Sequence, residues 1–223
     1  MSSAPAVVVV EHQEDDPAGL IGEWLDVRGI AWAVVHAGDP PPDPATPAAV
    51  ISLGSSHSAY APEPEWIARH AALLRAALAA DTPVLGVCFG AQALALAGGG
   101  EVARAPEPEV GWVEPESDHP ELRGPWLAWH SDSIIAAPPA AVELARSPAA
   151  LQAFRLGRSL AVQFHPEVTP AIWGDWTSSE PEFARRHAGD PERFAAGIAA
   201  RAVELRARVF ALLDWWHSSL VLA

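Results

Sequence analysis

The strongest structural signal in this chain is the stretch PVLGVCFGAQ, which runs from Pro83 to Gln92. Its first half, 83–87, is apolar throughout and predicts a buried β-strand. Gly86 and Gly90 stand on either side of Cys88, the spacing of a tight turn from a strand into a helix. Glycine suits such a turn because a side chain at either position would collide with neighbouring backbone. The stretch therefore predicts a strand, an elbow and a helix, with Cys88 at the carboxyl end of the strand.

This placement makes Cys88 a candidate nucleophile. A sulfur beside a helix N-terminus meets a partial positive charge, which favours the nucleophilic thiolate form. The flanking glycines and the following Gln92 point toward catalysis. A buried structural cysteine is the alternative that this stretch alone leaves open.

A second stretch ends in candidate catalytic residues. The apolar run 160–164 predicts another buried strand, and it stops at His165-Pro166-Glu167. A base at the end of a strand would face the same sheet edge as the cysteine elbow, and Glu167 could orient the imidazole of His165. Taken alone, His165 could also be an ordinary capped or solvated histidine.

Outward from these motifs, strands and helices alternate along the first half of the chain. This alternation of short apolar strands with helices is typical of a mostly parallel sheet covered on both faces, a flavodoxin-like α/β fold. The Pro- and Asp-rich segment 38–47 is expected to be a loop. We expect strands at 6–10, 30–35, 48–53 and 83–87, and helices at about 17–28 and 64–80.

The pattern changes in the second half. Short apolar pieces between 101 and 162 predict antiparallel strands and hairpins added to the sheet. After Pro166 the chain is expected to be irregularly helical, with a surface loop at 174–190 and one long helix at about 191–216. The short apolar pieces are 110–113, 126–129, 133–136, 151–154 and 159–164.

Composition and charge exclude several classes of function. The chain has 223 residues, which predicts a single domain over 1–223, and its formal net charge of −14 argues against nucleic acid and membrane surfaces as partners. All basic residues are arginine, which excludes mechanisms that depend on lysine, such as the P-loop and the Schiff base. One cysteine and no apolar leader or spanning segment indicate a cytoplasmic protein without a disulfide.

Together the two motifs resemble the class I glutamine amidotransferase family, with its Cys-His-Glu triad. In that family's pattern, 86–92 is the nucleophile box and 164–167 is the His-Glu box; the amidotransferase domain of GMP synthase is a similar member. The resemblance extends from the first strand to Glu167. Further landmarks appear in order at 51–56, 98–100, 110–112 and 129–132.

The resemblance implies a role for each matching residue. Cys88 would attack the side-chain amide carbon of glutamine, with His165 as its base and Glu167 orienting the ring, without metal or cofactor. Backbone N–H groups of Gly54 and Phe89 would form the oxyanion hole. Glutamine would be bound by Gln92, Ser131 and Asp132.

Some residues depart from the family pattern. Many members carry Gly-Gly-Pro at the oxyanion strand, where this chain has Leu53-Gly54-Ser55, so the proline that stiffens that loop is absent. Phe89 replaces a frequent Leu or Tyr. For His130 and Asp132, a hydrogen-bonded pair at the start of a strand is an alternative to a functional role.

Other functions fit the sequence less well. His165-Pro166-Glu167 contains the His-x-Glu of zinc deaminases, but those enzymes need two further cysteines that the chain lacks. The serine-hydrolase and dinucleotide motifs are absent. A γ-glutamyl hydrolase that acts alone on γ-glutamyl amides, and a non-catalytic binding subunit, remain open.

The implied reaction also bears on partners. The chain is too short to hold a synthetase site beside a glutaminase domain, so either the ammonia would pass to an acceptor on a separate protein or the protein would hydrolyse its substrate alone. Four tryptophans could form a docking surface for that partner, with core packing as the alternative: Trp173, Trp176, Trp215 and Trp216. A homo-oligomer is also open.

Overall fold

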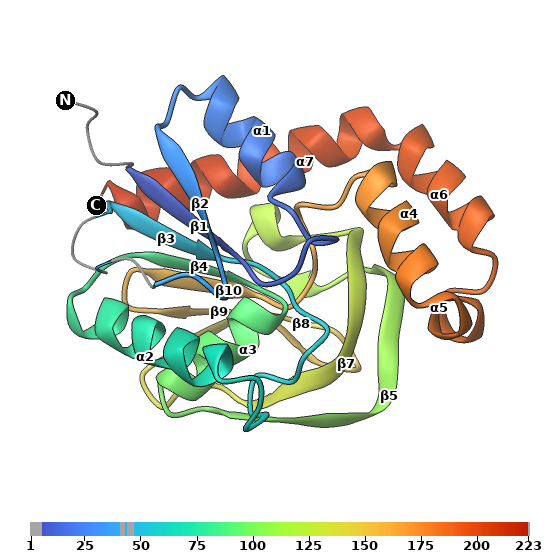
Figure 1. The fold of residues 1–223 in the computed structure, drawn as a ribbon. Coiled ribbons are helices and arrows are strands. Elements are labelled where there is room, and N and C mark those ends of the chain that lie inside the picture. Colours follow the sequence, from blue (N-terminus) through green and yellow to red (C-terminus); the bar gives the residue numbers. More distant parts are fainter. Residues whose placement is uncertain (1–5, 41–42, 44–46, 223) are drawn as a thin grey trace.

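The computed structural model describes residues 6–40, 43 and 47–222, so residues 41–42 and 44–46 of the predicted loop lie outside it. Its centre is an eight-stranded sheet in the order β2-β1-β3-β4-β10-β9-β8-β6 (Figure 1). The strands of this sheet are β1 (Val7–Glu11), β2 (Trp32–His36), β3 (Ala49–Ser52), β4 (Val84–Val87), β6 (Glu116–Ser117), β8 (Val142–Arg146), β9 (Leu151–Leu156) and β10 (Ser159–Val162).

The sheet is parallel over its first five positions. β1 pairs in parallel with β2 and β3, β3 with β4, and β4 with β10. β9 then pairs antiparallel with β10, β8 with β9, and β6 with β8. The predicted α/β fold, a mostly parallel sheet with added antiparallel strands, is therefore confirmed. β4 and β10 are neighbours, which brings the carboxyl ends of the two motif-bearing strands to one sheet edge.

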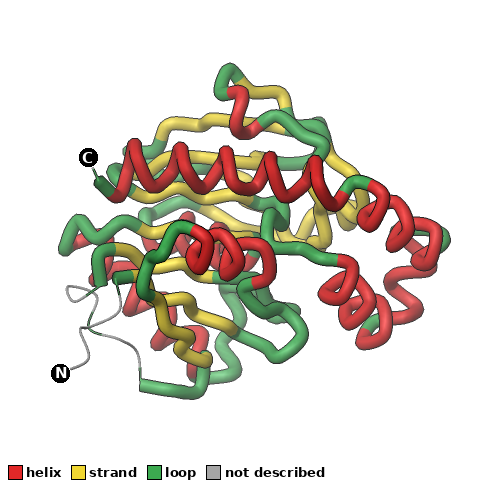
Figure 2. The backbone as a smooth tube through the Cα atoms, turned by 90° about the horizontal axis from the view of Figure 1, so that it is seen from above, coloured by secondary structure: helices red, strands yellow, loops and turns green. Residues whose placement is uncertain are grey.

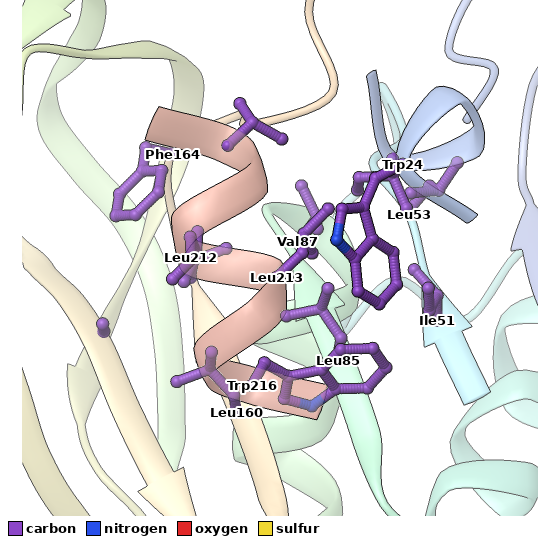
Figure 3. Close-up of a cluster of buried hydrophobic side chains, with 14 of the residues drawn as sticks. Trp24, Ile51, Leu53, Leu85, Val87, Leu160, Phe164, Leu212, Leu213 and Trp216 are labelled. Atoms are coloured by element: carbon purple, nitrogen blue, oxygen red, sulfur yellow. The ribbon is translucent and has the colours of Figure 1, made fainter. Parts of the chain in front are cut away.

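Helices cover both faces of the sheet (Figure 1). On one face lie α1 (Gly19–Val27) and α7 (Ala202–Trp216), and on the other lie α2 (Trp66–Ala79) and α3 (Phe89–Ala97). Each face buries its own apolar cluster. Figure 3 shows the first cluster, where Leu212, Leu213 and Trp216 of α7 meet Leu85 and Val87 of β4. Such covering allows every β4 residue to be buried, as an all-apolar strand requires.

Two long strands form a separate ribbon. β5 (Glu101–Val113) and β7 (Trp126–Ala136) pair antiparallel with each other and form a two-stranded sheet of their own. The prediction that every piece between 101 and 162 joins the central sheet was wrong for these two strands. The sequence suggested short pieces because polar residues interrupt the apolar pattern, and in the structure the pairing of the two strands shifts register between Arg104 and Glu109.

The segment predicted as a surface loop at 174–190 is largely helical, so that prediction was wrong. α4 (Pro170–Ser179) and α5 (Pro181–His187) fill most of it. α4 begins at Thr169, whose side chain accepts the N–H of Ile172, with a proline in the first turn. Its buried residues Trp173 and Trp176 hold it on the ribbon.

The long helix predicted at 191–216 is two helices. α6 (Pro191–Ala200) and α7 are separated at Arg201, and Figure 2 shows the bend between α7 and the smaller helices. α7 runs on into a π-helical segment, His217–Val221 (η2), and a short 3₁₀ turn, Pro120–Leu122 (η1), precedes β7.

Three of the four tryptophans predicted as a docking surface pack inside the protein. Trp173 is 1% exposed, Trp176 5% and Trp216 0%. Trp215 is half-buried and packs against the first apolar cluster. The docking prediction was therefore wrong at Trp173, Trp176 and Trp216, where the alternative of core packing is confirmed, and it stays a prediction at Trp215.

Two buried histidines predict acid sensitivity of the fold. Burial lowers the pKa of His70 from 6.5 to about 4, and it lowers the pKa of the neighbouring His12 well below the usual value. Because the unfolded chain takes up these protons first, stability is complete above about pH 6.5 and is lost as the pH falls from there. We expect the lowered pKa of His70 alone to reduce the free energy of unfolding by roughly 2 kcal/mol at about pH 5.

Urea unfolding at a series of pH values checks this expectation. His70 Nε2 lies 2.9 Å from Ser52 Oγ, so His70→Gln keeps a polar partner for Ser52 but cannot titrate, and it should flatten the acid slope. The exposed His36→Gln serves as the control and should leave the slope unchanged. An equal slope in wild type and His70→Gln would contradict the assignment.

None of the helices in the described part of the chain combines the length and the apolar composition that crossing a bilayer requires.

Candidate active site

Cys88 stands at a sharp turn between β4 and α3. Its backbone has φ 49° and ψ −104°, a conformation that is rare for a residue with a side chain. The turn is tight because a Cβ on Gly86 would lie 2.6 Å from the Gly90 carbonyl oxygen, and a Cβ on Gly90 would overlap the Ser52 carbonyl oxygen. The two glycines thus permit the predicted elbow, and the strained turn presents the thiol at the sheet edge.

His165 follows the neighbouring strand β10 and reaches the same edge. The Cys88 N–H donates to the carbonyl of Val162 at 2.9 Å, which locks the elbow beside the end of β10. Cys88 and His165 both line one small cavity of about 40 Å³. The two residues are separated by 77 positions in sequence, yet the parallel pairing of β4 and β10 brings them together.

Glu167 holds the ring of His165 from the other side. His165 Nδ1 lies 2.5 Å from Glu167 Oε1, and both side chains are buried. Burial disfavours the imidazolium, but the nearby Glu167 carboxylate and Cys88 sulfur, together with the hydrogen bond to Glu167, raise the pKa of His165 well above its usual value. The site therefore favours a protonated His165 beside a negatively charged partner.

The Cys88 sulfur has a further polar neighbour that the sequence interpretation missed. Gln163 Nε2 donates to Cys88 Sγ at 3.7 Å, and Gln163 is fully buried. The signal was present in the sequence, since Gln163 is a polar residue in the apolar run that precedes His165. An amide donor aimed at a sulfur atom stabilises negative charge that develops there during a reaction.

The predicted oxyanion loop lies next to the elbow. The Gly90 N–H donates to the carbonyl of Leu53 at 3.1 Å, which places Gly54 close to the start of α3. A Cβ on Gly54 would lie 3.1 Å from His165 Cε1. Gly54 and Phe89 thus flank Cys88, and their assignment as oxyanion donors stays a prediction.

A larger cavity of about 180 Å³ opens beside Cys88. The three predicted glutamine-binding residues, Gln92, Ser131 and Asp132, all line it. The Gln92 amide already donates to the Asp132 carbonyl at 2.9 Å and to Gln163 at 3.3 Å, so in this structure it supports the ribbon.

The Asp132 carboxylate is held from several sides. It accepts a hydrogen bond from Ser58 Oγ at 2.5 Å, and Arg104 Nη1 lies 3.7 Å away. His130 Nδ1 lies 3.0 Å from the backbone carbonyl of Asp132, so this pair is hydrogen-bonded as the alternative predicted, although it lies within β7 and not at a strand start.

α4 and α5 pack over the site, and the predicted loop at 174–190 missed most of these two helices. The ring of Trp176 contacts the ring of His165, with centroids 4.6 Å apart. Glu180 and Phe183 line the larger cavity together with Arg104 from β5. The sequence signal for these helices was the Thr169-Pro170 start and the proline at 181.

Within the described residues, one group has ligand atoms close enough to share an ion. Asp16, His165 and Glu167 place these atoms within 4.8 Å of one another. The His165–Glu167 hydrogen bond already uses two of them. Asp16 was also missed at the sequence level, because nothing in the segment 11–16 distinguishes it from its acidic neighbours.

Comparisons with known proteins agree with this geometry. The family model described as glutamine amidotransferase class-I matches residues 44–176. The chain is 34% identical over 161 residues to the glutamine-hydrolyzing GMP synthase of Aeropyrum pernix, over 59% of this chain and 31% of that protein. It is 40% identical over 107 residues to one subunit of the glutamine-hydrolyzing GMP synthase of Ignicoccus hospitalis, over 43% of this chain and 56% of that one.

The matched part thus spans between about a third and about a half of these two relatives. Among solved structures, the glutamine amidotransferase from Methylobacillus flagellatus superposes with a TM-score of 0.86 and 26% identity, covering 98% of this chain and 96% of that one. The family model alone matches more than half of the sequence. This chain therefore belongs to the class I glutamine amidotransferase family.

Proposed function

We propose that this protein hydrolyses the side-chain amide of glutamine through a thioester on Cys88. The observation that carries the proposal is that Cys88, on a strained elbow, and His165 line one cavity, while His165 is hydrogen-bonded to the buried Glu167. Cysteine, imidazole and carboxylate in this order are the parts of a nucleophilic hydrolase.

In the first half of the reaction, Cys88 attacks. Its proton resides on His165, and the thiolate sulfur forms a bond to the amide carbon of glutamine. The oxyanion that develops is held by the N–H groups of Gly54 and Phe89, each worth roughly 3 kcal/mol in comparable hydrolases. His165 then gives its proton to the nitrogen, the carbon–nitrogen bond breaks, and ammonia leaves a thioester behind.

In the second half, water replaces the sulfur. His165, now neutral, takes a proton from a water molecule that attacks the thioester carbon. The carbon–sulfur bond breaks, glutamate leaves, and the proton on His165 restores the starting pair with the Cys88 thiolate. Glu167 keeps the ring oriented through both halves.

The larger cavity supports binding of the amino-acid end of glutamine. Arg104 is the cationic side chain among its lining residues, while Asp132 and Glu180 supply negative charge. We propose that Arg104 binds the α-carboxylate of the substrate and that Asp132 and Glu180 bind its α-ammonium group. Gln92 and the backbone at Ser131 complete the walls.

Replacing Arg104 tests this orientation. Arg104→Gln is expected to raise the KM for glutamine roughly tenfold with little change in kcat, because the contact is the same in the ground state and the transition state. Arg123, which lies away from this cavity, provides the control variant Arg123→Gln. A fall in kcat at unchanged KM would contradict a substrate-binding role.

The names of the relatives bear on the fate of the ammonia. Because these relatives are GMP synthases, we propose that ammonia released here passes to a synthetase site on a partner protein. The alternative is a hydrolase acting alone on γ-glutamyl amides, and the 40 Å³ cavity on the His165 side of Cys88 gives a small leaving amine some room.

Release of glutamate and ammonia from glutamine is the direct assay, with γ-glutamyl amides run in parallel. Turnover of glutamine supports the proposal. Turnover of γ-glutamyl amides alone would favour the second reaction, and no turnover of either, with or without a partner, would refute both.

A further inference from the structure

Asp16 is a buried acid that the proposed reaction does not use. It lies in the loop between β1 and α1 and is 1% exposed. A Cβ on Gly54 would overlap Asp16 Oδ2, so the carboxyl group packs directly against the oxyanion loop. On its other side lies Glu167, and a ligand atom of each acid lies within 4.8 Å of the other.

Each of these acids has a buried oxygen with no hydrogen-bond donor. Within the described residues, neither Asp16 Oδ1 nor Glu167 Oε2 has a hydrogen-bond partner. Glu167 Oε1 is already engaged by His165 Nδ1. An unpartnered acceptor away from water is costly, and the cost is removed if one acid carries a proton and donates it to the other.

Electrostatics point to Asp16 as the protonated member. Burial, followed by the charge of Glu167, raises the pKa of Asp16 well above its ordinary value, and the neighbouring Asp15 acts in the same direction, while His165 opposes it. Glu167, in contrast, faces His165 directly and is the better place for the negative charge. Two adjacent buried carboxyl groups commonly share one proton in this way.

We propose that Asp16 is a positioning residue whose protonated carboxyl group donates a hydrogen bond to Glu167 and holds Glu167 against His165. The inference rests on the proposed function for its catalytic consequence. The first turn of α1, which follows this loop, supports Glu167 through its backbone, because the Leu20 N–H donates to the Glu167 carbonyl at 2.9 Å. Through Gly54, Asp16 also links the His-Glu pair to the oxyanion loop.

Paired substitutions test the hydrogen bond. In Asp16→Asn the amide can donate to Glu167 in place of the acid, so kcat for glutamine should stay within about threefold of wild type. In Asp16→Leu, which is similar in size but has no donor, kcat should fall between about tenfold and a hundredfold with little change in KM, as for other residues that orient a catalytic group. The pH–rate profile of Asp16→Leu should shift relative to wild type, while that of Asp16→Asn should not.

A spectroscopic measurement separates this inference from the proposed function. The infrared difference spectrum of wild type minus Asp16→Asn at neutral pH should contain the carbonyl stretch of a protonated carboxylic acid. That band is expected whether or not glutamine is hydrolysed, and it does not require Asp16→Leu to fold. Its absence would overturn the proposal.

Two kinetic outcomes would also overturn it. Equal losses in Asp16→Asn and Asp16→Leu would mean that Asp16 acts as a charged carboxylate, and equal losses accompanied by inhibition with a chelator would mean that it binds a cation. Full activity in Asp16→Leu would mean that Glu167 needs no support from Asp16.

Discussion

Replacing Cys88 with alanine is expected to lower glutamine hydrolysis by about a thousandfold or more. The loss follows because the proposed reaction has no path around the thioester, and removing the nucleophile of a triad costs at least this much in comparable hydrolases. The measurement is release of glutamate and ammonia at saturating glutamine, compared with wild type at the same protein concentration.

The fold of this variant must be checked separately. Cys88 is 5% exposed, so alanine leaves a small cavity beside Gln163, and thermal unfolding should show only a modest loss of stability. Cys88→Ser provides a closer match in shape and should also be inactive, because its hydroxyl is a far weaker nucleophile than a thiolate. A variant that keeps more than about a tenth of the wild-type rate would show that Cys88 does not form the intermediate.

Replacing His165 with alanine is the second change with a large expected effect. The variant loses both the group that holds the thiol proton and the acid that protonates the departing nitrogen, so kcat should fall by about a thousandfold. Glutamine binding should persist, because the larger cavity that Arg104 and Asp132 line does not include His165. Single-turnover kinetics together with binding measurements would separate the two effects.

The pH dependence of wild type gives this prediction a second readout. The active pair needs a proton on His165, and that proton is lost only as the pH rises through a pKa well above the usual value. The basic limb of the rate profile is therefore expected well above pH 6.5, with apparent pKa values that belong to the Cys88–His165 pair. Glu167→Gln removes the charge that raises this pKa and should move the limb toward lower pH. A limb that does not move would contradict the role of Glu167.

Much of the site could be predicted from the sequence because short stretches of it determine the local backbone conformation. The Gly86 and Gly90 pair permits only a narrow turn at Cys88, and the apolar run before His165 predicts a buried strand. Parallel strands end at a common edge, so the meeting of the two motifs followed from the fold class. The single-domain organisation, the cytoplasmic location and oligomeric association stay predictions.

The parts that were missed depend on contacts across long stretches of sequence. Nothing near Asp16 in the chain shows that it will lie beside Glu167, since the approach is made by the β1–α1 loop folding over the end of β10. The segment 174–190, which contains most of α4 and α5, was predicted as a loop because the apolar face of these helices is carried by few residues, chiefly Trp173, Trp176 and Phe183. These side chains pack against the ribbon of β5 and β7, so the apolar face that they form can be recognised only when the ribbon is known.

Covalent labelling by a glutamine-like diazo ketone tests the central claim most directly, with peptide mass spectrometry to locate the label. The account predicts one label on Cys88, formed in wild type, prevented by glutamine, and greatly slowed in His165→Ala. Label on another residue, or label on Cys88 that forms equally fast with glutamine present and with His165 removed, would contradict it.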